Sequence, residues 1–424
     1  MATSDMVADW RVSIVERPKT ALFGLFLVGL AVDLVLKLFG VQLTLGSANL
    51  LGGSLGLGRL ITLVWDGIVI GLGIGLAGIG LSMTYSILSF ANFAHGDYIT
   101  SGAFAGWAVA WLVAGFGSGQ LDGNVLYLAT VGFGPTGPSP ADLAINTIKT
   151  PIAVFGGLLV AVLATIALTL VIDRFIFKPM RNQGGITTLI ASIGVALALR
   201  YLIVFVFGAS NRGLTGGSPK LILAAVDGQF ALANKRSTII LAQNGNAPTD
   251  VFYWLFPVVD IGSYSTELLS VTGAELTIVA TSLALMYGLH VTLQRTKLGK
   301  AMRAMADNED LARVTGIPTE RVVRATWIIG GGLSGAAGYL IALERGTLAF
   351  NLGWLLLLLI FAAVILGGIG SIYGAMVGGI LIGLTNSVSL VWIPSSFSTA
   401  AAFVIMILVL VIRPDGLFGG VTTA

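Results

Sequence analysis

The sequence contains no cysteine and only two histidines in 424 residues. The lack of cysteine excludes disulfide bonds, a thiol nucleophile and cysteine-ligated metal sites. Two histidines also argue against a multi-histidine metal site, and we expect no metal and no other cofactor. Charged residues make up 10% of the chain, whereas soluble domains carry about a quarter. The net charge of +3 is too small to indicate a nucleic-acid partner.

Motifs for nucleotide chemistry are missing as well. The sequence has no G-x-x-x-x-G-K-[ST] phosphate loop, so we expect that the chain does not hydrolyse ATP by itself. The glycine-rich run GIGLAG at 73–78 lies inside a hydrophobic stretch without a preceding strand, which excludes a dinucleotide site. No nucleophile with a plausible base is apparent, and the chain is predicted not to be an enzyme.

Hydrophobic residues dominate what is present, at 56% of the chain with a mean hydropathy of +0.94. Such hydropathy over the whole length predicts an all-α polytopic membrane protein. The 57 glycines suit close contact between membrane helices. We expect about ten transmembrane spans, at 21–39, 62–88, 98–116, 151–172, 186–207, 268–293, 323–343, 353–368, 374–390 and 398–412. The spans at 353–368 and 374–390 are short and joined by GGIGSIYG, so broken or re-entrant segments are expected there.

The distribution of Lys and Arg predicts the orientation. With ten crossings, fourteen of the 23 basic residues fall in short segments on one side, which is therefore predicted to be cytoplasmic together with both termini. Residues 1–20 would form a cytoplasmic segment without a cleavable signal peptide. Residues 21–424 would form a single transmembrane domain in the plasma (inner) membrane, surrounded by lipid. The outer loops, 117–150 and 208–267, are rich in turn-forming residues and predicted to be irregular.

Polar and ionisable residues interrupt a long uncharged region at 89–106, SFANFAHGDYITSGAFAG. Ionisable residues inside a membrane segment are candidates for function, and a broken helix leaves backbone groups that need partners. We therefore expect a non-helical break at 89–98, with Asn92 and Asp97 bonding to freed backbone groups and Gly96 allowing the turn. The residues expected to support the break or line a translocation path are Asn92, His95, Gly96, Asp97 and Tyr98.

A weak internal repeat relates 95–107 to 367–379, because each places a polar residue after a glycine at the start of a span. Glycine-interrupted segments at corresponding places in two halves are typical of transport paths. This comparison and the hydroxyl residues after Gly184-Gly185 add further path or support candidates: Thr187, Thr188, Ser192, Gly370, Ser371, Tyr373 and Asn386. The hydroxyl groups can alternatively bond back to a carbonyl in their own helix. His290 is expected to reach toward water, and Asp33, Lys37, Asp66 and Arg200 to pair with one another or lie at an interface.

The loop 294–324 is the one long charged segment between spans. Its composition predicts two or three short helices, with Asp307 capping the second, Asp310 completing a capping box, and Gly316 and Pro318 ending it. The loop is either a solvated basic segment or a docking element whose apolar residues fit a groove in a soluble partner.

Four ordered motifs resemble one family: NFAHGDYITSGAF, RTKLGKAMRAMADNEDLARVTGI, ILGGIGSIYGAMVGGILIGL and RPDGLFG. Together they resemble the branched-chain amino acid ABC transporter permeases, specifically the H-type subunit of the high-affinity uptake system, over about 62–116 and 151–419. The resemblance implies a second, related permease subunit, two cytoplasmic ATP-binding subunits and an extracytoplasmic substrate-binding protein. It also implies that 294–324 is the segment that couples to the ATPase, carried by Met305, Asp307, Glu309, Leu311, Ala312 and Gly316.

The function implied by the resemblance is uptake of branched-chain or related amino acids, driven by ATP that the partner subunits hydrolyse. Related family members carry urea or short-chain amides, and Asn386 stands where members commonly have an acidic residue. An alternative from another class is an ion-coupled secondary transporter with His95 and Asp97 as the coupling pair. The loop 294–324 favours the ABC permease, because a secondary transporter needs no ATPase dock.

Overall fold

The computed structural model describes residues 18–45, 48–118, 143, 145–215, 220–226, 229–234 and 266–419. Its main helices are α2 (Pro18–Leu38), α3 (Leu57–Leu88), α4 (His95–Gly117), α6 (Pro151–Ile172), α8 (Gly185–Phe207), α9 (Gly273–Arg295), α10 (Lys297–Asp307), α11 (Glu309–Val314), α12 (Thr319–Arg345), α13 (Leu352–Gly367), α14 (Ile372–Val388) and α15 (Ser398–Ile412). Short helical turns lie between α6 and α8 (η1, Asp173–Phe177; α7, Lys178–Met180; η2, Arg181–Gln183) and before α15 (η4, Ser389–Val391; η5, Ser395–Phe397). The strands are β1 (Gln42–Leu45), β2 (Ala48–Gly52), β3 (Arg212–Gly213), β4 (Lys220–Val226), β5 (Gln229–Asn234), β6 (Thr266–Thr272) and β7 (Thr347–Leu348).

The protein is an all-α polytopic membrane protein. Within the described residues, nine helical segments are long and apolar enough to cross a bilayer, and α13 is a shorter apolar helix. Each of the ten spans predicted from hydropathy coincides with a helix, with α13 as the short span at 353–368. Most of the predicted N-terminal segment and of the outer loops lies outside the described residues.

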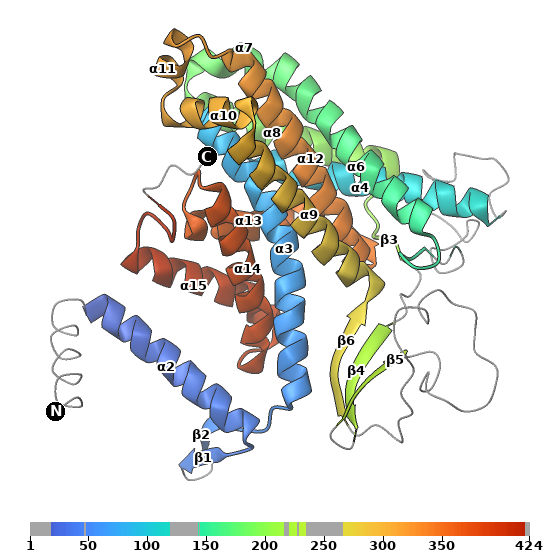
Figure 1. Ribbon diagram of the computed structural model, residues 1–424, viewed down its shortest axis with the longest axis vertical. Coiled ribbons are helices and arrows are strands. Elements are labelled where there is room, and N and C mark those ends of the chain that lie inside the picture. The colour runs from blue at the N-terminus through green and yellow to red at the C-terminus, as the bar shows by residue number, and fades with distance from the viewer. Residues whose placement is uncertain are drawn as a thin grey trace.

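A small antiparallel sheet, in the order β5-β4-β6, lies at the opposite end of the molecule from α10 and α11 (Figure 1). The expectation of an irregular loop at 208–267 was therefore wrong for the described strands. The sheet also moves the start of the following span from 268 to Gly273, because β6 continues to Thr272. There the Thr272 hydroxyl accepts a hydrogen bond from the Glu275 N–H at 3.2 Å and caps α9.

Helix α12 forms the centre of the bundle, because 89% of the residues in its most apolar 18-residue stretch are buried. It packs against α3, α4, α6 and α9. On another side of α3, the backbone of α14 approaches so closely that a Cβ at Gly383 would overlap the backbone of Gly67 and Gly71. This contact uses small residues to bring two helices together, as membrane helices commonly do.

The N-terminal helix α2 lies away from the bundle (Figure 1), and little of it is buried. The Asp33 carboxylate holds its end in place, because it accepts hydrogen bonds from Lys37 Nζ and Trp392 Nε1, both at 2.7 Å, and from the Gly52 N–H at 2.6 Å. The predicted pairing of Asp33 with Lys37 is thus observed.

Helices α10 and α11 lie across the end of the bundle remote from the sheet (Figure 1). Asn308 caps α11, because its Oδ1 accepts a hydrogen bond from the Leu311 N–H at 2.9 Å. The prediction that Asp307 is the cap was wrong by one residue, since Asp307 is the last residue of α10. Gly316 ends the segment as expected, with a φ of 84° that favours glycine.

Candidate functional site

The polar stretch after α3 forms a break that folds back into the bundle. Helix α3 ends at Leu88, Ser89 adopts a left-handed conformation with a φ of 53°, and α4 begins at His95. The His95 Nε2 lies 2.9 Å from the carbonyl oxygen of Ala77, eleven residues before the end of α3 and therefore about 16 Å along that helix. The chain thus re-enters the bundle. The break covers 89–94 and not 89–98, because His95, Gly96 and Asp97 form the first turn of α4.

Two side chains bond to backbone groups that the break leaves free. Asn92 is fully buried, and its Oδ1 accepts a hydrogen bond from the Ala94 N–H at 3.1 Å. The Phe93 N–H donates to the hydroxyl of Ser192 in α8 at 3.0 Å. These contacts satisfy backbone groups that have no water available in a bilayer, as expected for Asn92.

Asp97 does not bond to freed backbone N–H groups, as had been expected, but forms an ion pair with Arg200 of α8. The Arg200 Nε lies 3.2 Å from one carboxylate oxygen, and its Nη2 lies 2.9 Å from the other. Asp97 is fully buried, and the Arg200 guanidinium lies over the ring of Trp354 in α13 at 4.6 Å. The pair therefore joins α4 to α8 beside α13. Sequence reasoning noticed Arg200 inside a span but did not identify Asp97 as its partner.

The remaining residues at the start of α4 pack against other helices. The Ser334 hydroxyl of α12 lies 3.4 Å from both ring nitrogens of His95, which is buried. Gly96 lies against the backbone of Gly353 in α13. The buried ring of Tyr98 lies edge-on to Trp327 of α12, with 6.5 Å between ring centroids.

The hydroxyl residues at the start of α8 mainly bond within their own chain segment. Thr187 and Thr188 donate to the carbonyl oxygens of Gln183 and Gly184 at 3.1 and 3.2 Å. Ser192 donates to the Leu189 carbonyl at 2.6 Å, and it also accepts the hydrogen bond from the break. Of the three hydroxyl candidates, Ser192 is therefore the one that contacts the break.

The second glycine-rich segment forms a separate group of contacts. Gly370 has a φ of 87°, and its carbonyl accepts a hydrogen bond from the Ser86 hydroxyl of α3 at 2.8 Å. Ser371 caps α14 by accepting from the Gly374 N–H at 3.0 Å. The two copies of the weak repeat thus both start a helix after a non-helical segment, but α14 packs on α3 whereas α4 packs on α6 and α12.

Tyr373 and Asn386 lie on different parts of α14. The Tyr373 hydroxyl lies 2.7 Å from the Nδ1 of the exposed His290 and accepts from Gln294 Nε2 at 3.1 Å. Asn386 Nδ2 lies 3.4 Å from the Ser398 hydroxyl. The contacts of these two side chains do not connect them to the break.

The residues predicted to couple to an ATPase divide into two groups. Met305 and Ala312 are each 3% exposed and hold α10 and α11 on the bundle. Leu311 is 62% exposed and, with Val314 at 85%, forms an apolar patch on α11. Among the polar members of the set, Asp307 is exposed at the end of α10, and Glu309 pairs with Arg313 within α11 at 2.8 Å.

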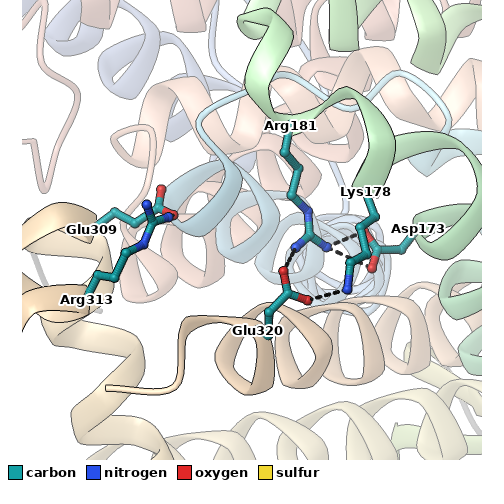
Figure 2. Close-up of polar contacts among 6 residues, drawn as sticks. All are labelled: Asp173, Lys178, Arg181, Glu309, Arg313 and Glu320. Carbon is teal, nitrogen blue, oxygen red and sulfur yellow. Dashed lines mark hydrogen bonds and ion pairs between the residues drawn. The ribbon is translucent and has the colours of Figure 1, made fainter. Parts of the chain in front are cut away.

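A charge cluster near α11, which sequence reasoning missed, contains Asp173, Lys178, Arg181 and Glu320 (Figure 2). Arg181 Nη2 contacts both oxygens of Asp173 at 2.7 and 2.9 Å, and its Nη1 contacts Glu320 Oε1 at 3.0 Å. Lys178 Nζ contacts the other Glu320 oxygen at 2.9 Å. Glu320 lies about 140 residues away in the chain, so spacing alone carries no signal for this contact.

Comparison with models of known protein families shows which family the chain belongs to. The family model described as "Branched-chain amino acid transport system / permease component" matches residues 63–412. The chain belongs to this family. It is therefore a member of a family of membrane transport permeases, which are not known as enzymes. The break, the α10–α11 segment and the charge cluster all lie inside the matched residues, whereas α2 precedes them.

Individual proteins that are similar to the chain are likewise described as branched-chain amino acid transport permeases. The chain is 25% identical over 359 residues to the high-affinity branched-chain amino acid transport system permease protein LivH of Escherichia coli K12, covering 84% of this chain and 94% of that protein. It is 24% identical over the same shares to the corresponding protein BraD of Pseudomonas aeruginosa. A probable LivH of Methanocaldococcus jannaschii is 37% identical over 32% of this chain and 45% of its own length. No solved structure shows significant similarity to the chain.

Proposed function

We propose that this chain is the H-type permease subunit of an ABC importer for branched-chain or related amino acids. The observation that carries the proposal is the family match over 63–412. The re-entrant break supports it, because non-helical backbone at membrane depth is tolerated where it is buried or lines a cavity. Transporters commonly place such broken helices at the translocation path.

The proposed partners are a second permease subunit, two ATP-binding subunits and a substrate-binding protein. We assign the ATPase contact to α10 and α11, which present Leu311 and Val314 to solvent at one end of the bundle. Exposed apolar side chains on a short helix are typical of a helix that inserts into a groove of a partner. In this arrangement the α10–α11 end and both termini face the cytoplasm, and residues 21–424 form one transmembrane domain.

The residues around the break form the proposed support of the path. Asn92, Ser192 and the Asp97–Arg200 pair hold the break in position, while His95 contacts α3 and lies beside Ser334 of α12. In the ion-coupled alternative, Asp97 would take up and release a proton or cation. Its two-point contact with Arg200 favours a fixed structural charge, and the family match favours the ABC permease.

Replacing Leu311 by Asp tests whether α10 and α11 form the dock, which is the proposed contact surface for the ATP-binding subunit. The exposed position tolerates a charge in the isolated subunit, whereas a carboxylate in an apolar groove of the ATPase is costly. We expect normal amounts of folded permease, reduced co-purification of the ATP-binding subunits and loss of ATP-driven amino acid uptake. The matched control is Leu311→Met, which keeps an apolar side chain of similar size at the same exposed position. Full ATPase binding and uptake by Leu311→Asp would contradict the assignment.

A further inference from the structure

The charge cluster connects the start of α12 to the segment between α6 and α8. Glu320 is in the first turn of α12, directly after the turn that follows α11. Lys178 and Arg181 belong to the segment between α6 and α8. Each oxygen of the Glu320 carboxylate contacts a different cation, at 2.9 and 3.0 Å (Figure 2). One carboxylate therefore joins α12 to the α6–α8 connection.

The link from α11 to Glu320 is short and internally bonded. The Ile317 N–H donates to the Ala312 carbonyl at 3.0 Å, and the Arg321 N–H donates to the Pro318 carbonyl at 2.9 Å. Proline also fixes one backbone torsion of this turn. The turn between α11 and the first turn of α12, where Glu320 lies, is thus held by its own backbone hydrogen bonds.

The other side of the cluster leads to the break. Residues 173–183 continue through Gly184, which has a φ of 84°, into α8. Helix α8 carries Ser192, which holds the Phe93 N–H of the break, and Arg200, which holds Asp97. The contacts from α11 through Glu320 and α8 to the break therefore form one continuous physical route.

The contact between Lys178 and Glu320 is exposed to solvent and is therefore a weak one. The side chains of Lys178 and Glu320 are 51% and 58% exposed, and ion pairs at such exposure contribute little to folding stability. Arg181 is more buried and is fixed by its two contacts with Asp173, which is 8% exposed. The Asp173–Arg181 pair is thus the less exposed half of the cluster, while the contacts of Glu320 contribute little to the stability of the fold.

We propose that Glu320, with Lys178 and Arg181, forms a separable tie that transmits movement of α11 to α8 and so to the membrane break. This inference rests on the proposed function, because it assigns a positioning role within the same coupling process. The quantity that tests energetic coupling along this route is the interaction between the paired residues, measured by substituting each of them alone and both together.

The test reconstitutes the permease with its partner subunits in lipid vesicles and measures amino acid uptake per ATP hydrolysed. Glu320→Gln keeps every Lys and Arg, so the charges that set membrane orientation are unchanged. We expect intact assembly and ATP hydrolysis with about a fivefold lower uptake per ATP, within the usual range of coupling between sites. The matched control is Asp415→Asn, which keeps every Lys and Arg and neutralises an exposed carboxylate that lies outside the cluster and forms no ion pair within the described residues.

A charge exchange provides the second measurement. Glu320→Lys is expected to lower uptake per ATP further than Glu320→Gln, and the double variant Lys178→Glu/Glu320→Lys to recover at least part of the loss. Glu320→Gln with wild-type uptake per ATP, loss of assembly in that variant, or a double variant no better than Glu320→Lys would each overturn the tie. Absence of ATP-driven uptake by the wild-type complex would instead refute the proposed function.

Discussion

The ion pair between the buried Asp97 and the partly buried Arg200 is the main electrostatic feature of the membrane break. Asp97 follows a segment that carries no other charge for 28 residues, 67–94, and lies in the first turn of α4. An isolated carboxylate in this position would be strongly unfavourable, and the guanidinium of Arg200 compensates it with two contacts. The sequence identifies both residues as unusual. It does not pair them, because 103 residues separate them and the pairing depends on how α4 packs against α8.

Replacing Asp97 by Asn should destabilise the permease substantially. The change leaves the Arg200 guanidinium, whose side chain is 13% exposed, without its counter-charge, and breaking a buried pair from one side typically costs about 3–5 kcal/mol. We expect a large fall in the thermal unfolding temperature of the purified, detergent-solubilised protein. The double variant Asp97→Asn/Arg200→Gln removes both charges and should recover part of that loss. Equal stability of Asp97→Asn and the wild type would show that the pair does not hold α4 to α8.

At the scale of elements, glycine determines how closely the helices approach. Abundant glycine in apolar runs predicted close contacts, and Gly102 and Gly106 do meet α12 and α6. The pairing of α3 with α14 could not be predicted in the same way, because glycine shows that a close approach is possible but not which helix approaches. The cap of α11 was predicted only approximately, because the sequence placed it at Asp307, one residue before the observed Asn308.

Replacing Gly383 by Ala should weaken the contact between α3 and α14. The added Cβ would overlap the backbone of Gly67 and Gly71, and such overpacking costs roughly 1–3 kcal/mol. Thermal unfolding in detergent measures the effect. The matched control is Gly288→Ala in α9, where an added Cβ meets nothing within 4 Å and alanine is the better helix former. A Gly383→Ala protein as stable as the control would show that the two helices are not in close contact.

At the scale of the whole molecule, the sequence predicted the fold class and the position of every described membrane helix. Hydrophobic runs of about 20 residues carry that information directly. The sequence did not predict the β5-β4-β6 sheet, because polar turn residues around it dominate the composition of that region. It also missed the charge cluster, whose members come together only after α6 and α12 have packed. The candidate site was thus predictable as a set of unusual residues, and its contacts were not.

The orientation proposed for the molecule rests on its basic residues, and it can be tested directly because the chain has no cysteine of its own. Asp310 is exposed on α11 and Ser210 is exposed at the other end of the bundle, after α8. In intact cells, a membrane-impermeant maleimide should label Ser210→Cys and should label Asp310→Cys only after permeabilisation. A membrane-permeant maleimide that labels both variants is the control. Labelling of Asp310→Cys from outside alone would invert the topology. The apolar patch of α11 would then face away from the ATP-binding subunits, and both the dock and the tie at Glu320 would lose their basis.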